Sequence, residues 1–269
     1  MKKFLLLTAF AAGFSLGAVE PVPLQRWDAE RGTIDWDGGM NVAAEAARSG
    51  NKGYLIRGKK RLTTLKSVEI DPDMKYRATI YLRSKGSEKA EIYVGYVCYD
   101  ENGKIIPSQA YHRVPGSLTS LTAPAKKGDT VLYVADGAKW KKANNYTVVF
   151  NAAADESDLP NYSSIGPVKE VKAVDGKWQI TLGKPLTQDY AAGTMVREHT
   201  LGGDYYFYIA QVNFTDWKKI TTGWTPGKNL RRAKKIKMVI ISNLRSDCNK
   251  GEIYLDDVVF EVDGQNVSF

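Results

Sequence analysis

The chain has 269 residues, with 38 Lys and Arg against 30 Asp and Glu, so its formal net charge is +8. Hydrophobic residues make up 43% of it, which is enough for a core and excludes a globally disordered chain. Two histidines and two cysteines are too few for a three-histidine or a cysteine-rich zinc site. At this length we expect one large domain or two small ones.

The N-terminal residues have the pattern of a bacterial-type secretory signal peptide. Lys2 and Lys3 precede an apolar run over residues 4–14, and the small residues of 15–18 suit a signal peptidase. We therefore expect residues 1–18 to be removed and the protein to be secreted, periplasmic or on the cell surface. No later stretch approaches the ~20 apolar residues of a spanning helix, so no transmembrane segment is expected.

Strand-like runs rich in Val, Ile, Tyr and Thr recur between turn residues, which predicts an almost entirely β protein. The one helical pattern is Asn41–Arg48, which stops at Gly50. In residues 91–100 both alternating faces are apolar or aromatic, which is typical of a central strand in a two-layer structure. The turn sequence of 100–103 predicts a hairpin. The expected strands here are 53–57, 76–83, 91–100, 205–213, 235–242 and 252–262.

The composition changes in the middle of the chain, where short strands are spaced closely by turn signals. We expect these strands to form a small β-barrel-like insert over residues 119–199, the middle segment, with Gly-containing joints at either end. The insert divides the remainder into 19–118 and 200–269. The strands expected in the middle segment are 130–134, 146–150, 169–174, 178–182 and 194–196.

With the middle segment removed, the flanking sequence falls into two halves with recognisable motifs. The first half contains VEIDPDMKYRATIYLR at 68–83 and IYVGYVCYDENGKI at 92–105. The second half contains FTDWKKIT at 214–221 and EIYLDDVVF at 252–260. Together these motifs resemble the two halves of a galactose-binding-like jelly roll, a fold of carbohydrate-binding modules of xylanases and cellulases. The resemblance implies a discontinuous jelly-roll β-sandwich built from 19–118 and 200–269, which would bind a polysaccharide or surface glycan.

Asp256 and Asp257 are the first candidates for a metal site. Adjacent carboxylates on a strand are expected to point to opposite faces, so one could bind Ca²⁺ while the other faces solvent or a neighbouring strand. The resemblance implies a structural calcium shared between the closing strand and the N-terminal region, here Asp28 or Glu30. The family's usual Asn-x-x-Phe-Glu opening is replaced by Trp-Asp-Ala-Glu at 27–30. The alternative is that the aspartates accept hydrogen bonds from backbone amides and pair with Lys or Arg.

Aromatic residues are the candidate sugar-binding groups, because the C–H faces of sugars stack on aromatic rings. By alternation one of the pairs Tyr205/Phe207 and Tyr206/Tyr208 should face the core and leave the other as a platform. We assign Tyr206 and Tyr208 to this platform, together with Trp224, which we place on a loop. The alternative for each ring is a place in the core or at its rim.

Arg231, Arg232 and Lys234 belong to the densest cluster of cations and are expected to hold an anionic glycan. The alternative is a solvated strand edge where lysines block edge pairing. Nucleic acid is disfavoured as a partner by export and by the lack of a recognisable binding motif.

Other readings of the function remain open. No common catalytic motif is present, and we predict a non-catalytic protein. A glycan-processing enzyme would need His112 or His199, the latter beside Glu198, to meet further carboxylates in a pocket. A structural or adhesin-like surface protein would use the middle segment to contact a protein partner.

Cys98 and Cys248 could form a disulfide in an oxidising compartment. The alternative places Cys98 in a buried strand and Cys248 in a Gly/Asn turn. The sequence does not show whether the two Cα atoms come close enough for a disulfide.

Overall fold

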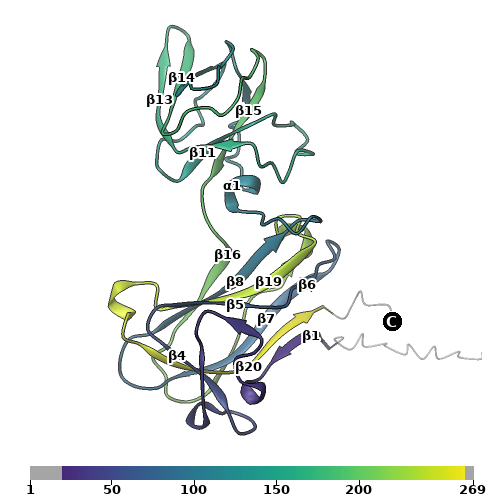
Figure 1. The fold of residues 1–269 in the computed structure, drawn as a ribbon, viewed down its shortest axis with the longest axis vertical. Helices are drawn as coiled ribbons and strands as arrows, with labels where there is room; N and C mark the ends of the chain where they lie inside the picture. Colours follow the sequence, from purple (N-terminus) through teal and green to yellow (C-terminus); the bar gives the residue numbers. More distant parts are fainter. Residues whose placement is uncertain (1–19, 264–269) are drawn as a thin grey trace, which may run out of the picture.

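The computed structural model describes residues 20–263 (Figure 1). The predicted signal peptide therefore lies outside the described residues. Four antiparallel sheets make up the fold, two large and two small. No helix within residues 20–263 is long and apolar enough to span a membrane. The helical pieces are η1 (Ala29–Arg31), η2 (Ala44–Ala46), α1 (Ser108–Tyr111), η3 (Gly227–Asn229) and η4 (Ser246–Cys248).

The first large sheet has the order β17-β7-β20-β4-β3, with β1 and β18 pairing beside β20 and β7 respectively. The long strands β7 and β20 form its centre and pair along most of their length. Its strands are β1 (Val22–Trp27), β3 (Asn41–Ala43), β4 (Gly53–Arg57), β7 (Lys75–Ser84), β17 (Lys218–Thr221), β18 (Thr225–Pro226) and β20 (Glu252–Val262).

The second large sheet has the order β16-β8-β19-β5-β2, with β6 pairing beside β19. Its central strands β8 and β19 carry apolar side chains on both faces, as expected for residues 91–100. Its strands are β2 (Trp36–Asp37), β5 (Lys60–Thr64), β6 (Val68–Glu69), β8 (Glu91–Tyr99), β16 (Tyr205–Gln211) and β19 (Lys235–Ser242).

One hydrophobic core lies between these two sheets and makes them a β-sandwich. Alternate residues of β7 and β20 meet alternate residues of β8 and β19 in it. The rings of Tyr96 on β8 and Phe260 on β20 meet at 5.6 Å across the two layers. The predicted all-β, jelly-roll sandwich is thereby confirmed, and its six principal strands match the predicted ranges to within two residues.

The middle segment forms two further sheets around a second core. One has the order β12-β11-β15-β9 and the other β10-β14-β13, and an isolated bridge between Leu121 and Val134 links their edges. Both sheets contribute to a separate cluster of buried residues. The strands are β9 (Thr119–Ser120), β10 (Val131–Val134), β11 (Tyr146–Phe150), β12 (Ser164–Ile165), β13 (Val168–Val174), β14 (Lys177–Leu182) and β15 (Met195–Thr200).

The short helical pattern at Asn41–Arg48 does not form an α-helix. Residues 41–43 form β3, which pairs with β4, and only 44–46 adopt a single 3₁₀ turn. Eight residues of helical propensity are too few to nucleate a stable helix, and pairing with the sheet edge satisfies the backbone instead.

Two stretches of chain connect the sandwich to the middle segment, one through α1 after β8 and one between β15 and β16 (Figure 1). Arg231 lies between them and is only 2% exposed. Its Nη1 donates to the carbonyl of Ile106 on the outgoing stretch at 2.8 Å and to that of Gly203 on the returning stretch at 3.0 Å. Arg231 therefore links the two stretches, which also bond to each other directly, as from the N–H of Thr200 to the carbonyl of His112 at 2.8 Å.

Gly95 on β8 lets β16 pack closely against it, and this generates a first prediction. A Cβ at this position would lie 2.1 Å from the carbonyl oxygen of Tyr205 and 2.4 Å from the Cα of Tyr206. Gly95→Ala should therefore lower the free energy of unfolding by about 1–3 kcal/mol, the usual cost of overpacking.

Urea unfolding followed by circular dichroism checks this. Gly86→Ala is the matched control, because nothing lies within 4 Å of the added Cβ there and its φ is not positive. Equal unfolding midpoints for the two variants would contradict the close approach of β16.

Candidate ligand-binding surface

Alternation along β16 places its aromatic residues on two faces, as predicted. Tyr205 and Phe207 pack on the sandwich core, and each ring lies 6.3 Å from that of Tyr96. Tyr206 and Tyr208 point to the outside and are 43% and 49% exposed. The pairing register with β8 sets this arrangement, because Tyr206 lies opposite Gly95 and Tyr208 lies opposite Tyr93.

Tyr93 joins the two exposed rings into a tyrosine cluster of Tyr93, Tyr206 and Tyr208. Its ring meets that of Tyr206 edge-on at 5.7 Å and that of Tyr208 at 5.4 Å. Such edge-to-face contacts fix the orientation of aromatic rings. The sequence analysis did not single out Tyr93, although the alternation within 91–100 places it on the outer face.

The tyrosine cluster is anchored at one end by a buried carboxylate. The hydroxyl of Tyr93 donates to Oε2 of Glu91, whose side chain is fully buried. Glu91 in turn pairs with Nε of Arg245 at 2.9 Å and accepts the backbone N–H of Arg245 at 2.7 Å. Burial, reinforced by the charge of Glu91, raises the pKa of Tyr93, so this hydroxyl stays protonated and donates.

An apolar floor extends from the tyrosine cluster across the outer face of the same sheet. It consists of Val97, Val239 and Ile241, which are nearly or fully buried, with Tyr93 and Tyr99 packed against them. The register puts Ile241 opposite Tyr93 and Val239 opposite Gly95. The aliphatic side chains therefore support the tyrosine cluster from beneath, and the exposed surface is that of the tyrosine rings.

An ion pair spans this face. Arg61 on β5 donates from Nη2 and Nε to Oδ2 of Asp204, at 2.7 and 3.0 Å, and from Nη1 to Thr63. Asp204 immediately precedes β16, so the pair reaches across the two strands, β8 and β19, that lie between. Arg61 is half-exposed, and exposed pairs contribute little stability, so its polar groups can exchange this partner for others.

Trp224 lies apart from the tyrosine cluster. Its half-buried ring sits in the short segment between β17 and β18, with the guanidinium of Arg77 over it at 4.4 Å. Arg77 belongs to the outer face of the first sheet, since its neighbours Tyr76 and Ala78 face the core. The sandwich thus separates Trp224 from Tyr206 and Tyr208, and the single three-residue platform is not formed.

The three basic residues Arg231, Arg232 and Lys234 do not lie on one common surface. Arg231 is buried and bonded to backbone carbonyls, which corrects its assignment as a ligand-binding surface residue. Arg232 and Lys234 are exposed and line a common cavity beside the middle segment. Arg231 and Arg232 both have positive φ, 56° and 55°, and this left-handed turn sends successive side chains in different directions.

Both aspartates of β20 accept hydrogen bonds from the same segment, residues 48 and 49, and do not point to opposite faces of the sheet. Oδ2 of Asp256 accepts the N–H groups of Arg48 and Ser49, while Oδ2 of Asp257 accepts Nε of Arg48 and Oγ of Ser49. A bulge in the pairing of β20 with β7 and a φ of 45° at Asp257 interrupt the alternation. The prediction of opposite faces is therefore wrong.

The four predicted metal ligands do not fit a calcium ion. Asp256 and Asp257 are saturated by N–H donors, a hydroxyl and the guanidinium of Arg48, which also pairs with Asp257 at 2.7 Å. Asp28 caps η1 by accepting the N–H of Glu30, whose own carboxylate accepts the N–H groups of residues 51 and 52. Within the described range, no group of three or more His, Cys, Asp or Glu side chains could hold a metal.

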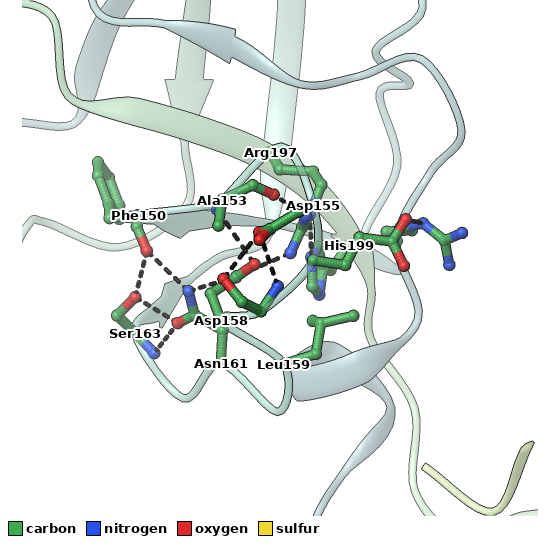
Figure 2. Close-up of polar contacts among 12 residues, drawn as sticks. Phe150, Ala153, Asp155, Asp158, Leu159, Asn161, Ser163, Arg197 and His199 are labelled. Atoms are coloured by element: carbon green, nitrogen blue, oxygen red, sulfur yellow. Dashed lines mark hydrogen bonds and ion pairs between the residues drawn. The ribbon is translucent and has the colours of Figure 1, made fainter. Parts of the chain in front are cut away.

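His199 belongs to a buried polar network in the middle segment (Figure 2). Its Nδ1 donates to the carbonyl of Gln109 on α1, and its Nε2 accepts from Nε of Arg197 at 2.9 Å. Arg197 pairs with Asp158 at 2.8 Å, and Asp158 also accepts the side-chain N–H of Asn161. Burial and the adjacent Arg197 lower the pKa of His199 to about 4, so the imidazole is neutral.

This network holds the loop between β11 and β12 against β15. Asn161 further donates to the carbonyl of Phe150, and Arg197 donates to that of Ala153. His112 lies elsewhere and packs against the rings of Tyr111 and Tyr205. In this structure His199 is held by hydrogen bonds and His112 by aromatic packing, and the two do not meet in a common pocket among those described.

The cysteines are not bonded to one another. Both Cys98 and Cys248 are free and buried, the first on β8 in the sandwich core and the second in η4. Burial raises the pKa of the Cys98 thiol to about 12, so the thiol is protonated at neutral pH.

Glu198 and His199 are adjacent and fully buried. Their pKa values are shifted in opposite directions, so they have opposite effects on how the free energy of unfolding changes with pH. Burial raises the pKa of Glu198 from 4.5 to about 7, so its contribution to stability is lost as pH rises between these values. The pKa of His199 falls from 6.5 to about 4, so its contribution is lost as pH falls between those values. The two effects largely cancel between pH 4.5 and 6.5.

Glu198→Gln should remove the loss of stability with rising pH that Glu198 causes. Its unfolding free energy should exceed that of the wild type by an amount that grows from pH 4.5 to pH 7 and reaches about 3 kcal/mol. Urea unfolding at several pH values measures the difference, with the exposed Glu88→Gln as control. A difference independent of pH would show that Glu198 is ionised in the folded protein.

No protein-family model matches the chain, and no curated protein does. Among solved structures it is similar to the CBM22-1 xylan-binding domain from Paenibacillus barcinonensis Xyn10C, at 12% identity and a TM-score of 0.39, over 91% of this chain and 98% of that one. It is similar to the family 16 carbohydrate-binding module-2, at 13% identity and 0.36, over 87% and 94%.

A third similar structure is the arabinose-bound MgGH51 α-L-arabinofuranosidase, at 8% identity and a TM-score of 0.38. That match covers 91% of this chain but only 25% of the enzyme.

Proposed function

We propose that this chain is an exported, non-catalytic protein that binds a polysaccharide or surface glycan at the outer face of β16 and β8. The observation that carries the proposal is the tyrosine cluster, in which Tyr206 and Tyr208 are exposed while Tyr93 fixes both rings from below. Exposed aromatic rings that are held in place are unusual on a soluble surface unless they meet a partner.

The chemistry of the surface suits a sugar chain. A pyranose presents apolar C–H groups on its faces and hydroxyls around its edge, so it needs a ring to stack on and polar groups beside it. The tyrosine cluster supplies the rings, and the buried apolar floor of Val97, Val239 and Ile241 supports them from beneath. Arg61 and Asp204 supply donors and acceptors for hydroxyls at its far side.

The surface is organised before any ligand arrives. The edge-to-face contacts and the Tyr93–Glu91–Arg245 chain restrict the rings, so little side-chain entropy remains to be lost on binding. The proposal includes removal of residues 1–18 and a sandwich of 19–118 and 200–269 that carries this surface, interrupted by the middle segment.

Replacing both Tyr206 and Tyr208 with alanine should lower the affinity for a bound glycan. Each lost ring removes about 1 kcal/mol of stacking, so the dissociation constant should rise roughly tenfold or more. A glycan array probed with the mature chain identifies the ligand, and isothermal titration calorimetry then measures wild type and variant.

Two single variants serve as controls for this experiment. Tyr133→Ala removes a ring of similar exposure, 40%, from β10 in the middle segment, and Trp224→Ala removes one from the opposite layer of the sandwich. Both should bind the glycan like the wild type. A folded double variant with unchanged affinity, or an equal loss in Trp224→Ala, would exclude this surface as the binding site.

A further inference from the structure

A cavity of about 410 Å³ lies where the middle segment meets the sandwich. Leu159 and Pro160 form its wall on the side of the middle segment, and Pro72, Glu101 and the 228–234 loop form the other. This volume lies within the range of about 300–1,000 Å³ that is usual for small-molecule sites. The cavity is distinct from the tyrosine cluster, none of whose residues lines it.

Three cations converge on the cavity against one carboxylate. Lys228, Arg232 and Lys234 line it, and all three are exposed. None of them forms an ion pair within 4.0 Å in the part of the chain that the structure describes, whereas the neighbouring Lys235 pairs with Glu69 at 3.0 Å. Glu101 is the one acidic residue in the lining. The cavity therefore has a net positive lining, and its walls of low dielectric focus that field.

The backbone holds these cations in place. The N–H of Lys228 donates to the carbonyl of Pro72 at 3.0 Å, and that of Lys234 donates to the carbonyl of Tyr99 at 2.9 Å. Between them Arg231 and Arg232 have left-handed φ values, which cost energy for residues other than glycine. With this backbone the Arg231 side chain is buried in the protein, while Arg232 lines the cavity. Nη1 of Arg232 donates to the carbonyl of Leu159 at 3.2 Å.

We propose that this cavity, the junction pocket, binds the anionic group of an acidic sugar, a uronate carboxylate or a sulfate ester. A carboxylate or sulfate can accept hydrogen bonds from the two lysines and from the N–H groups of Arg232 that do not donate to Leu159. The apolar side chains of Pro72, Leu159 and Pro160 offer contact to the C–H groups of the sugar ring. The choice of a sugar as the carrier of the anion rests on the proposed function.

The test uses the mature chain and three probes of known charge. These are trigalacturonate, a sulfated heparin disaccharide and neutral galactotriose, each titrated by calorimetry at low salt. The test variant is Lys228→Ala/Lys234→Ala, whose side chains make no hydrogen bond or ion pair within the described residues. The control is Lys142→Ala/Lys177→Ala, which removes two exposed lysines of the middle segment and changes the net charge equally.

The wild type should bind at least one of the two acidic probes, and added salt should weaken that binding. The test variant should lose roughly tenfold or more in affinity for that probe, since charge-assisted hydrogen bonds are lost, while the control keeps most of it. Glu101→Gln should bind the acidic probe more tightly than the wild type, because it removes the only like charge in the lining. Structural damage would not produce this gain.

The proposal is overturned if neither acidic probe binds, if the control loses as much affinity as the test variant, or if Glu101→Gln binds more weakly. Its failure is distinguishable from failure of the proposed function, because the tyrosine variants leave the junction pocket intact. Acidic probes that bind in Tyr206→Ala/Tyr208→Ala but not in Lys228→Ala/Lys234→Ala support the junction pocket even if no neutral glycan binds.

Discussion

Arg231 is a buried charge at the point where the two connecting stretches meet the 228–234 loop. Arg231 has no carboxylate within 4.0 Å among the described residues, and its Nε has no hydrogen-bond partner. Burying a charge in this way costs several kcal/mol. The two carbonyls that accept from Nη1 offset part of that cost, because hydrogen bonds to charged groups contribute about 1.5–3 kcal/mol each. They come from the two stretches that join the sandwich to the middle segment.

Residues of both candidate sites adjoin Arg231 or one of the groups to which it bonds. Gly203, which accepts from Arg231, is followed directly by Asp204, the partner of Arg61, and then by β16 with Tyr206 and Tyr208. On the other side, the left-handed turn that buries Arg231 presents Arg232 to the junction pocket. One constraint thus places an aromatic surface and a cationic pocket on the same molecule. Such a pair suits a glycan with both neutral and acidic units.

The sequence predicts most of this fold because the long strands carry patterns that only one structure satisfies. Residues 91–100 are apolar on both faces, and they form the central β8 between the core and the apolar floor. The same reasoning places Tyr206 and Tyr208 outside and Tyr205 inside. Where alternation persists, residue type and position suffice to assign a face.

The errors fall where the backbone departs from regular geometry. The bulge at Asp256 and Asp257 cannot be read from the residues, and it turns a predicted metal site into a cap for the backbone of residues 48 and 49. The basic run 231–237 predicts a solvated edge or ligand surface, whereas a positive φ buries its first arginine. Trp224 lies on the other layer from the tyrosines, and the sequence does not show which layer a loop adjoins.

The central claim is that the tyrosine cluster is the glycan-binding surface. The most direct measurement is a ¹³C NMR titration of the mature chain, labelled in its tyrosine and tryptophan rings, with the best neutral oligosaccharide from a glycan array. The account predicts shifts confined to the rings of Tyr93, Tyr206 and Tyr208, with Trp224 and Tyr133 unchanged. Shifts at Trp224 or Tyr133 while the tyrosine cluster stays unperturbed would contradict it.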